Sequence, residues 1–285
     1  MGNKNYHIGL YEKAMPSSLN WEEKLKCAKD CGYDFVEISI DETDARLARL
    51  DWTAQERAQL RETMQKIGVP IRSMCLSGHR KYPFGASDPA VRRRSLEIME
   101  KAIQLSDDLG IRVIQLAGYD VYYEEGSEQT RKDFADNLKK AVEMAAVHGV
   151  VLGFETMETP FMDTVEKAMT YVSQINSPYL GVYPDLGNIT NGSFISGKPV
   201  ADDLATGRGH LIAVHCKETA VGRYREVPFG TGTTDWDALE EAVRQGVRRF
   251  VAEFWYVGSE SWREETADAC KFVRGKVESA FDRCA

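Results

Sequence analysis

Two hydrophobic patterns alternate along this chain from one end to the other. The first is a short run of apolar and β-branched residues, such as Val-Val-Leu-Gly-Phe from Val150. Runs of this kind predict parallel strands that are buried on both faces. We expect strands at residues 7–13, 34–40, 71–77, 111–117, 150–156, 180–184, 211–217 and 249–255.

Between these runs, apolar residues recur at the three- and four-residue spacing of an amphipathic helix. Thr53 and Asp88 are typical N-cap residues, and Gly68 and Gly110 stand where two of the helices should end. The stretch between the strand at 180–184 and residue 201 is rich in Asn, Gly and Ser and is expected to be a loop. We expect helices at residues 21–31, 53–67, 88–109, 127–148, 163–175, 201–206, 235–245 and 264–281.

Eight successive strand–helix units are the pattern of a (β/α)₈ TIM barrel. No linker and no low-complexity tract divides the chain, so we expect residues 1–285 to form one α/β barrel domain. A doubly wound open sheet is the alternative, but no G-x-G-x-x-G motif follows the first strand.

Composition limits the partners of the protein. A net charge of −8 argues against a nucleic-acid backbone or an anionic membrane, because both select basic surfaces. The polar N-terminus does not read as a secretory segment, and no apolar run approaches the roughly 20 residues of a membrane span. The six cysteines lack paired C-x-x-C spacing, and Cys27 and Cys31 are expected to pack as small hydrophobic residues. We expect a cytoplasmic protein that acts on a small molecule.

Four of the expected strands end in a residue type that binds metal ions: Glu155, Asp185, His215 and Glu253. In a barrel, the carboxyl ends of all strands lie at one face, so these side chains should converge. Three carboxylates so close together would repel one another unless a cation held them. One imidazole and three carboxylates suit Mn²⁺, Mg²⁺ or Co²⁺ better than a thiolate-rich zinc site does. We predict one divalent metal ion, with Mn²⁺ favoured and Mg²⁺, Co²⁺ or Zn²⁺ as alternatives.

Two of these four residues are glutamates on the fifth and eighth strands, roughly opposite each other around the ring. A metal ion polarises a bound carbonyl and an adjacent hydroxyl, which acidifies the C–H bond between them. Glu155 and Glu253 are therefore candidate catalytic residues, one removing the proton and the other returning one to the opposite face. This chemistry is epimerisation or 1,2-isomerisation of a keto sugar through an enediolate. Hydrolysis by a metal-bound water is the competing chemistry.

Basic residues near the same face suggest phosphate sites. The glycine-rich stretch 219–232 carries Arg223 and Arg225, and loops after the seventh and eighth barrel strands commonly bind phosphate. Lys217 lies two residues beyond His215 and should point inward with it. A plain surface loop is the alternative for residues 219–232.

Three further groups at the same face stay ambiguous. His79 and Arg80, next to Lys81, form a rival phosphate site or part of a surface loop. Glu12 and Glu37 either reach the catalytic face or are solvated charges on its rim.

Longer segments carry a more specific signal than single residues do. They begin at Gly9 (Gly-Leu-Tyr-Glu-Lys-Ala), Phe35 (Phe-Val-Glu-Ile-Ser-Ile-Asp-Glu-Thr-Asp), Arg49 (Arg-Leu-Asp-Trp), Ser73 (Ser-Met-Cys-Leu-Ser-Gly-His-Arg), Ile114 (Ile-Gln-Leu-Ala-Gly-Tyr-Asp-Val-Tyr-Tyr), Tyr183 (Tyr-Pro-Asp-Leu-Gly-Asn), Val214 (Val-His-Cys-Lys-Glu-Thr), Val227 (Val-Pro-Phe-Gly-Thr-Gly) and Glu253 (Glu-Phe-Trp). In these segments, which span nearly the whole chain, the protein resembles the L-ribulose-5-phosphate 3-epimerase (L-xylulose-5-phosphate 3-epimerase) family of xylose-isomerase-like barrels.

The resemblance implies interconversion of L-ribulose 5-phosphate and L-xylulose 5-phosphate in bacterial use of L-ascorbate or a related sugar acid. It implies that Glu155 and Glu253 are the acid/base pair, that these two glutamates hold the metal with Asp185 and His215, and that the protein is a homodimer. Hexulose-6-phosphate isomerase, or another ketose or ketose-phosphate epimerase or isomerase of the superfamily, is the alternative.

The chain departs from the family pattern at two expected substrate contacts. Glu158 stands where a shorter aspartate is expected, and Asn188 takes the position of a histidine in related epimerases of unphosphorylated ketoses. We expect both residues, with His79 and Lys217, to bind substrate.

Two other functional classes fit less well. A metal-dependent nuclease of this superfamily would need a basic face and more histidines than the five present here. A non-catalytic sugar-phosphate sensor could lose an acid/base glutamate, whereas both are present.

Overall fold

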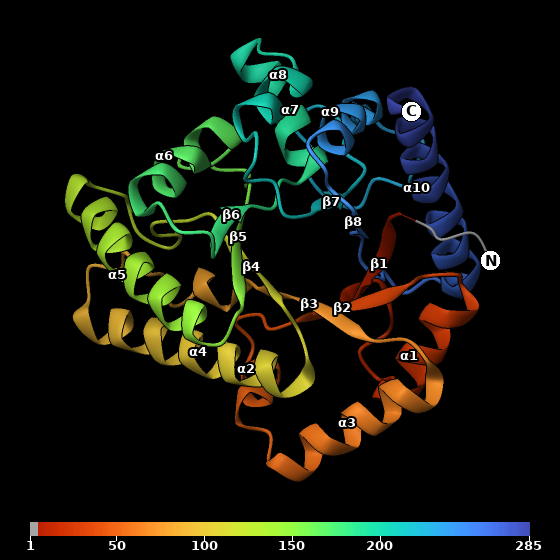
Figure 1. Ribbon diagram of the computed structural model, residues 1–285, viewed down its shortest axis with the longest axis horizontal. Helices are drawn as coiled ribbons and strands as arrows, with labels where there is room; N and C mark the ends of the chain where they lie inside the picture. Colours follow the sequence, from red (N-terminus) through yellow and green to blue (C-terminus); the bar gives the residue numbers. More distant parts are fainter. Residues whose placement is uncertain (1–4) are drawn as a thin grey trace.

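The computed structural model describes residues 5–285, and its centre is a ring of eight parallel strands surrounded by helices (Figure 1). The strands are β1 (His7–Tyr11), β2 (Phe35–Ser39), β3 (Ile71–Leu76), β4 (Val113–Ala117), β5 (Val151–Glu155), β6 (Leu180–Val182), β7 (Val214–Cys216) and β8 (Arg249–Ala252). They pair in the order β6-β5-β4-β3-β2-β1-β8-β7. Two bridges, Val182 to Leu211 and Asp185 to His215, link β6 to β7 and close the ring. The predicted barrel is confirmed.

Helices cover the outside of the ring. They are α1 (Trp21–Asp30), α2 (Asp44–Leu47), α3 (Ala54–Ile67), α4 (Pro89–Leu109), α5 (Glu128–Val147), α6 (Val165–Ile175), α7 (Leu186–Ser196), α8 (Val200–Thr206), α9 (Leu239–Arg244) and α10 (Trp262–Cys284). The predicted end signals of two of them are confirmed. Thr53 and Asp88 accept hydrogen bonds from the first turns of α3 and α4, and Gly68 and Gly110 end these helices in the left-handed conformation.

The stretch after β6 is a helix, α7, and the expectation of a loop there was wrong. Asn and Gly disfavour helices in isolation, but here the residues from Leu186 to Gly192 are all buried. Asn188 and Asn191 bond to groups outside the helix, to the carbonyl of Thr156 and to the Thr219 hydroxyl. Tertiary packing therefore compensates for weak helix propensity.

Smaller departures occur at several element ends. The sixth strand is shorter than predicted because Pro184 has no backbone N–H to donate to the hydrogen-bond ladder of the sheet. The predicted helix at 235–245 begins with a 3₁₀ turn, η4 (Trp236–Ala238). Three more short turns were not predicted: η1 (Glu12–Ala14), η2 (Ala48–Asp51) and η3 (Ser77–Arg80). Among residues 5–285, the helices are all too short or too polar to cross a membrane.

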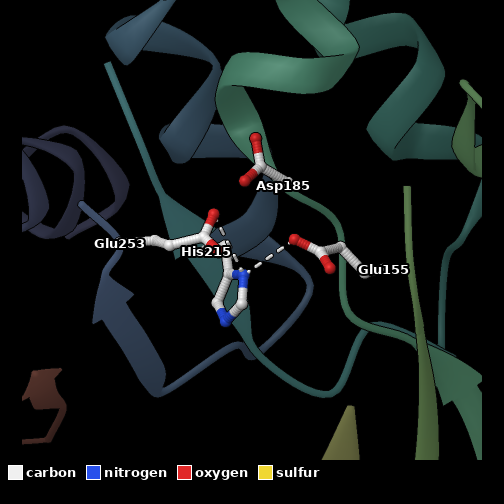
Figure 2. Close-up of side chains that lie close together, drawn as sticks. All are labelled: Glu155, Asp185, His215 and Glu253. Carbon is white, nitrogen blue, oxygen red and sulfur yellow. Dashed lines mark hydrogen bonds and ion pairs between the residues drawn. The ribbon is translucent and has the colours of Figure 1, made fainter. Parts of the chain in front are cut away.

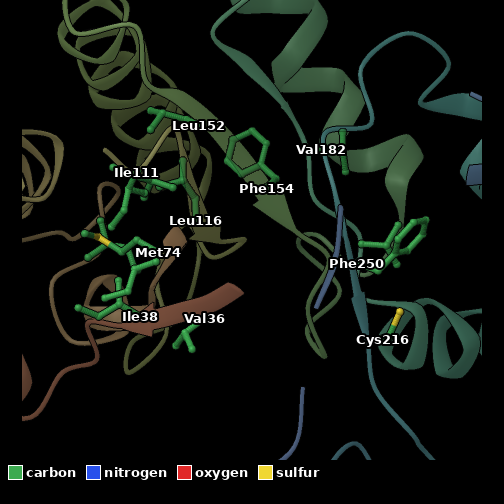
Figure 3. Close-up of a cluster of buried hydrophobic side chains, with 14 of the residues drawn as sticks. Val36, Ile38, Met74, Ile111, Leu116, Leu152, Phe154, Val182, Cys216 and Phe250 are labelled. Atoms are coloured by element: carbon green, nitrogen blue, oxygen red, sulfur yellow. The ribbon is translucent and has the colours of Figure 1, made fainter. Parts of the chain in front are cut away.

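Alternating strand residues build two separate cores. One layer lies between the strands and the helices and includes Ile38, Met74, Leu152, Phe154 and Phe250 (Figure 3). The other fills the inside of the ring and consists of Tyr11, Phe35, Cys75, Val113, Tyr183, Ala213 and Val251. Gly9 makes this filling possible, because a Cβ at that position would lie 2.4 Å from the ring of Phe35. Side chains therefore fill the inside of the ring, and buried polar residues such as Glu37, Ser73 and Gln115 lie beside the apolar ones.

Candidate active site

Glu155, Asp185, His215 and Glu253 come together at the carboxyl end of the barrel (Figure 2). Each offers a ligand atom, and these atoms all lie within 4.8 Å of one another. Glu155 ends β5 and His215 lies in β7, while Glu253 follows β8 directly. The bridge between Asp185 and His215 that closes the ring also sets two of these residues side by side.

The imidazole of His215 lies at the centre of this cluster. Its Nδ1 atom is 3.0 Å from Glu155 Oε1 and 3.6 Å from Glu253 Oε2. Its Nε2 atom, on the opposite edge of the imidazole, is 2.6 Å from Glu37 Oε1. Burial alone would lower the pKa of His215, but the carboxylates of Glu37 and Glu253 outweigh it and raise this pKa well above its usual value.

The two carboxylate oxygens of Asp185 make different contacts. Oδ1 accepts a hydrogen bond of 2.6 Å from the backbone N–H of Asn188 and so caps α7. Oδ2 lies 2.9 Å from the ammonium of Lys217 and points into the cluster. Burial raises the pKa of Asp185 to about 7, although Lys217 opposes this.

The cluster fits a divalent cation. Asp185 Oδ2 and Glu253 Oε2 are both buried, and neither accepts a well-aligned hydrogen bond within the described range 5–285, although the ammonium of Lys217 lies 2.9 and 3.5 Å from them. One ammonium does not balance the three buried carboxylates of the cluster, and uncompensated buried charge is costly, so a divalent cation would complete the site. Oxygen and imidazole ligands suit Mn²⁺, Mg²⁺, Co²⁺ or Zn²⁺.

A cavity opens directly above the cluster. It is lined by Tyr11, Lys13, Cys75, Ser77, Arg80, Glu155, Met157, Glu158, Asn188, Lys217, Tyr224, Arg225, Glu253 and Trp255. Four of the lining residues are cationic, in an otherwise acidic protein. Lys13 is already paired with Asp41 at 2.5 Å, and the guanidinium of Arg225 lies over the ring of Trp255. A polar cavity with aromatic walls and several cations suits a small, anionic, hydroxylated molecule.

A larger cavity of about 520 Å³ lies outside the barrel, between the loop after β7 and α10. Its walls are mostly apolar, with Phe229, Phe254 and Phe272 among them, and it holds none of the four clustered residues. The smaller cavity is therefore the candidate active site.

Three of the four expected substrate contacts line this cavity. Lys217 donates to the side chain of Asn188 at 2.8 Å, and Glu158 accepts from the hydroxyl of Tyr119 at 2.7 Å. His79 does not line it. Its ring packs on Phe84 and its Nε2 atom lies 3.1 Å from a backbone carbonyl, and burial lowers its pKa to about 4.

Of the three arginines expected to bind phosphate, two line the cavity and one does not. Arg80 and Arg225 line the cavity, and Arg80 lies over the ring of Tyr122 at 4.9 Å. Arg223 instead donates to the carbonyls of Arg225 and Glu226 within its own loop. A buried carboxylate, Glu218, accepts from the backbone of Gly230 and Thr234 and sets the shape of this loop.

Neither Glu12 nor Glu37 is a solvated rim charge, since both side chains are 0% exposed. Glu12 lies among Lys24, Arg46 and Arg49, each with a nitrogen 2.6 Å from its carboxylate. Glu37 contacts His215. The available signal was a charged residue within an apolar strand, which must face the barrel interior or find a buried partner.

Several more residues at the site were not assigned a role from the sequence, among them one glutamine and three aromatic residues. Gln115 donates to Glu155 Oε2, and Tyr11, Tyr224 and Trp255 line the cavity. Gln115 carried a signal, because it is a polar residue inside a strand, while the aromatic residues look like ordinary core positions in the sequence.

Comparison with known proteins defines the class of protein. The family model described as xylose isomerase-like TIM barrel matches residues 25–276, and the chain belongs to this family. Two solved structures share the fold: a D-psicose 3-epimerase (16% identity, TM-score 0.77, covering 95% of this chain and 99% of that one) and an L-ribulose 3-epimerase (19%, 0.74, 98% and 97%).

A curated relative is much more similar in sequence. The L-ribulose-5-phosphate 3-epimerase UlaE of Salmonella paratyphi B is 44% identical over 282 residues, which cover 98% of each chain. The resemblance to the L-ribulose-5-phosphate 3-epimerases that the sequence indicated is thereby confirmed.

Proposed function

We propose that this protein is an isomerase, a metal-dependent 3-epimerase that interconverts L-ribulose 5-phosphate and L-xylulose 5-phosphate. The observation that carries the proposal is the pair Glu155 and Glu253, which flank His215 within a four-residue cluster that fits a divalent ion (Figure 2). The name and the 44% identity of the Salmonella relative support the choice of substrate.

In this proposal, one divalent ion is held by Glu155, Asp185, His215 and Glu253, and Mn²⁺ is favoured over Mg²⁺, Co²⁺ or Zn²⁺. When bound, the ion would polarise the ketone and the neighbouring hydroxyl of the sugar. Glu155 and Glu253 approach the cluster from β5 and β8. One removes the proton at C3 and the other returns a proton to the opposite face of the enediolate, which inverts the configuration.

The surrounding side chains orient the sugar. Gln115 donates to Glu155 and so directs its second oxygen toward the reaction centre. Lys217, directly after β7, and Asn188 in α7 face the same space. Lys217, 3.5 Å from Glu253 Oε2, places a fixed positive charge where the enediolate would carry negative charge. Glu158 is proposed to contact a sugar hydroxyl, and His79 would act on the substrate only indirectly.

The sugar phosphate is proposed to lie at the basic side of the cavity. Arg80 and Arg225 supply guanidinium groups there, and Arg223 keeps the loop of Arg225 in place through its carbonyl contacts. Guanidinium groups suit phosphate because they form paired, charge-assisted hydrogen bonds. We further propose a cytoplasmic homodimer that acts in L-ascorbate degradation, with no nucleic-acid or membrane partner.

The test is proton NMR of the purified protein with L-ribulose 5-phosphate in D₂O. We expect conversion to L-xylulose 5-phosphate with deuterium at C3, and loss of both after treatment with a chelator. Glu155→Gln and Glu253→Gln should each abolish the exchange, whereas Glu62→Gln, at an exposed site on α3, should not change it.

Two outcomes would contradict the proposal. Exchange that persists in either glutamine variant would remove that glutamate from the mechanism. Exchange at C1 with formation of an aldose phosphate would favour the alternative, another ketose-phosphate isomerase of the same superfamily.

A further inference from the structure

We infer that Glu37 is a positioning residue: it holds the imidazole of His215 in the tautomer and orientation in which Nδ1 can bind the metal ion. The inference rests on the proposed metal site and extends it to a residue on the far side of the barrel, outside the four-residue cluster. The nearest approach is the bond of 2.6 Å between Glu37 Oε1 and His215 Nε2.

Both oxygens of Glu37 have defined partners. Oε1 faces His215, and Oε2 accepts hydrogen bonds from the hydroxyls of Ser73 at 2.6 Å and Tyr183 at 2.9 Å. A carboxylate accepts hydrogen bonds and does not donate them, so His215 must carry a proton on Nε2. Nδ1 also faces carboxylates, those of Glu155 and Glu253 at 3.0 and 3.6 Å, and a metal ion bound there would replace its proton while the proton on Nε2 stays with Glu37.

The strand register around Glu37 serves this arrangement. The pairing of β2 with β3 shifts between Val36 and Glu37, so that Val36 pairs with Ile71 but Glu37 pairs with Ser73. Without the shift, Glu37 would lie opposite Arg72, which alternates to the other face of the strand. Irregularities of this kind near active sites commonly redirect a side chain.

Tyr183 fixes the imidazole in a second way. Its ring packs against that of His215 with centroids 4.7 Å apart and planes at 61°. All three side chains, Glu37, Tyr183 and His215, are 0% exposed, so water cannot replace the contacts when a ligand enters the cavity. The imidazole of His215, held at Nε2 by Glu37 and at its face by Tyr183, is thus already oriented for metal binding.

The experiment measures Mn²⁺ binding to the chelator-treated full-length protein by isothermal titration calorimetry. We expect Glu37→Gln to weaken Mn²⁺ binding by about 10- to 100-fold, the usual effect of removing such a partner of a metal-binding histidine. Tyr183→Phe, which removes one hydroxyl and keeps the ring, should weaken it by roughly fivefold. The absorption spectrum of the Co²⁺-loaded Glu37→Gln variant should shift, since the geometry of the imidazole ligand changes.

A double-mutant cycle separates positioning from general structural damage. If Glu37 acts through His215, Glu37→Gln will have no further effect on Mn²⁺ binding in a His215→Gln background. Glu12→Gln is the matched control, because it changes another fully buried strand-end carboxylate that has no contact with the cluster. This control should lower stability and leave Mn²⁺ affinity within twofold of the wild type.

An unchanged Mn²⁺ affinity in folded Glu37→Gln would overturn the inference, as would additive losses in the cycle. If Glu37→Gln does not fold, Tyr183→Phe decides, and an unchanged affinity in that variant has the same meaning. A wild-type protein that binds no divalent ion would instead refute the metal site of the proposed function.

Discussion

Asp185 joins metal binding to helix formation, and two substitutions should separate these tasks. Asn caps a helix as well as Asp does, but it lacks the charge that a divalent ion requires; Ala supplies neither. Asp185→Asn should therefore keep the cap on α7 and lose the metal ligand. Asp185→Ala should lose both.

The magnitudes follow from the two oxygens. The bond from the Asn188 N–H to Oδ1 is an N-cap contact, worth about 1 kcal/mol in the free energy of unfolding. Metal binding at 100 times the dissociation constant adds about 2.7 kcal/mol. Both substitutions remove the carboxylate charge that lies 2.9 Å from Lys217, so the loss of this ion pair is common to the two variants.

Urea unfolding with chelator and with excess Mn²⁺ measures both terms. We expect Asp185→Ala to be less stable than Asp185→Asn by about 1 kcal/mol without metal. Only the wild type should gain about 2.7 kcal/mol when Mn²⁺ is present at 100 times its dissociation constant. A full gain in Asp185→Asn would show that this carboxylate is not a ligand, and equal stability of the two variants would show that the cap contributes nothing.

Three further predictions concern the rest of the barrel. Burial alone would raise the pKa of Glu12, but Arg49, Lys24 and Arg46 outweigh it and lower this pKa from 4.5 to about 2. A lowered carboxyl pKa stabilises the fold above pH 4.5, and this contribution of about 3 kcal/mol to the free energy of unfolding is lost as the pH falls toward 2. Glu12→Gln should therefore flatten the dependence of urea unfolding on pH in this range. An unchanged dependence in the variant would refute the assignment. Arg225→Ala should lower kcat/KM by roughly tenfold or more for L-ribulose 5-phosphate and much less for unphosphorylated L-ribulose, with Arg223→Ala as the comparison; equal losses on both sugars would exclude a phosphate contact. Gly9→Ala should destabilise the protein by about 1–3 kcal/mol, because its Cβ would overlap the Phe35 ring, and Phe35→Leu in the same chain should restore part of the loss in thermal unfolding.

The sequence alone determined the barrel and the meeting of the four clustered residues. Strand periodicity is local, and a barrel brings every strand end to one face, so Glu155 and Glu253 could be placed together although they lie on different strands. The helix ends at Gly68 and Gly110 could also be predicted from the sequence, because glycine adopts the left-handed conformation found there without steric strain.

The tertiary structure decided which of the other candidates belong to the site and which unexpected residues join them. Helix α7 forms because its surroundings bury it and bond to its asparagines, and helix propensity predicts the opposite. Glu37 has no neighbour in sequence that explains it, since Tyr183 and His215 reach it from 146 and 178 residues away. His79 and Arg80 are adjacent in sequence, yet one packs on Phe84 and the other lines the cavity. The local sequence pattern predicts which face of a strand a side chain occupies. Its contact partners depend on how the strands close into a ring, and every buried charge needs an oppositely charged or hydrogen-bonding partner there.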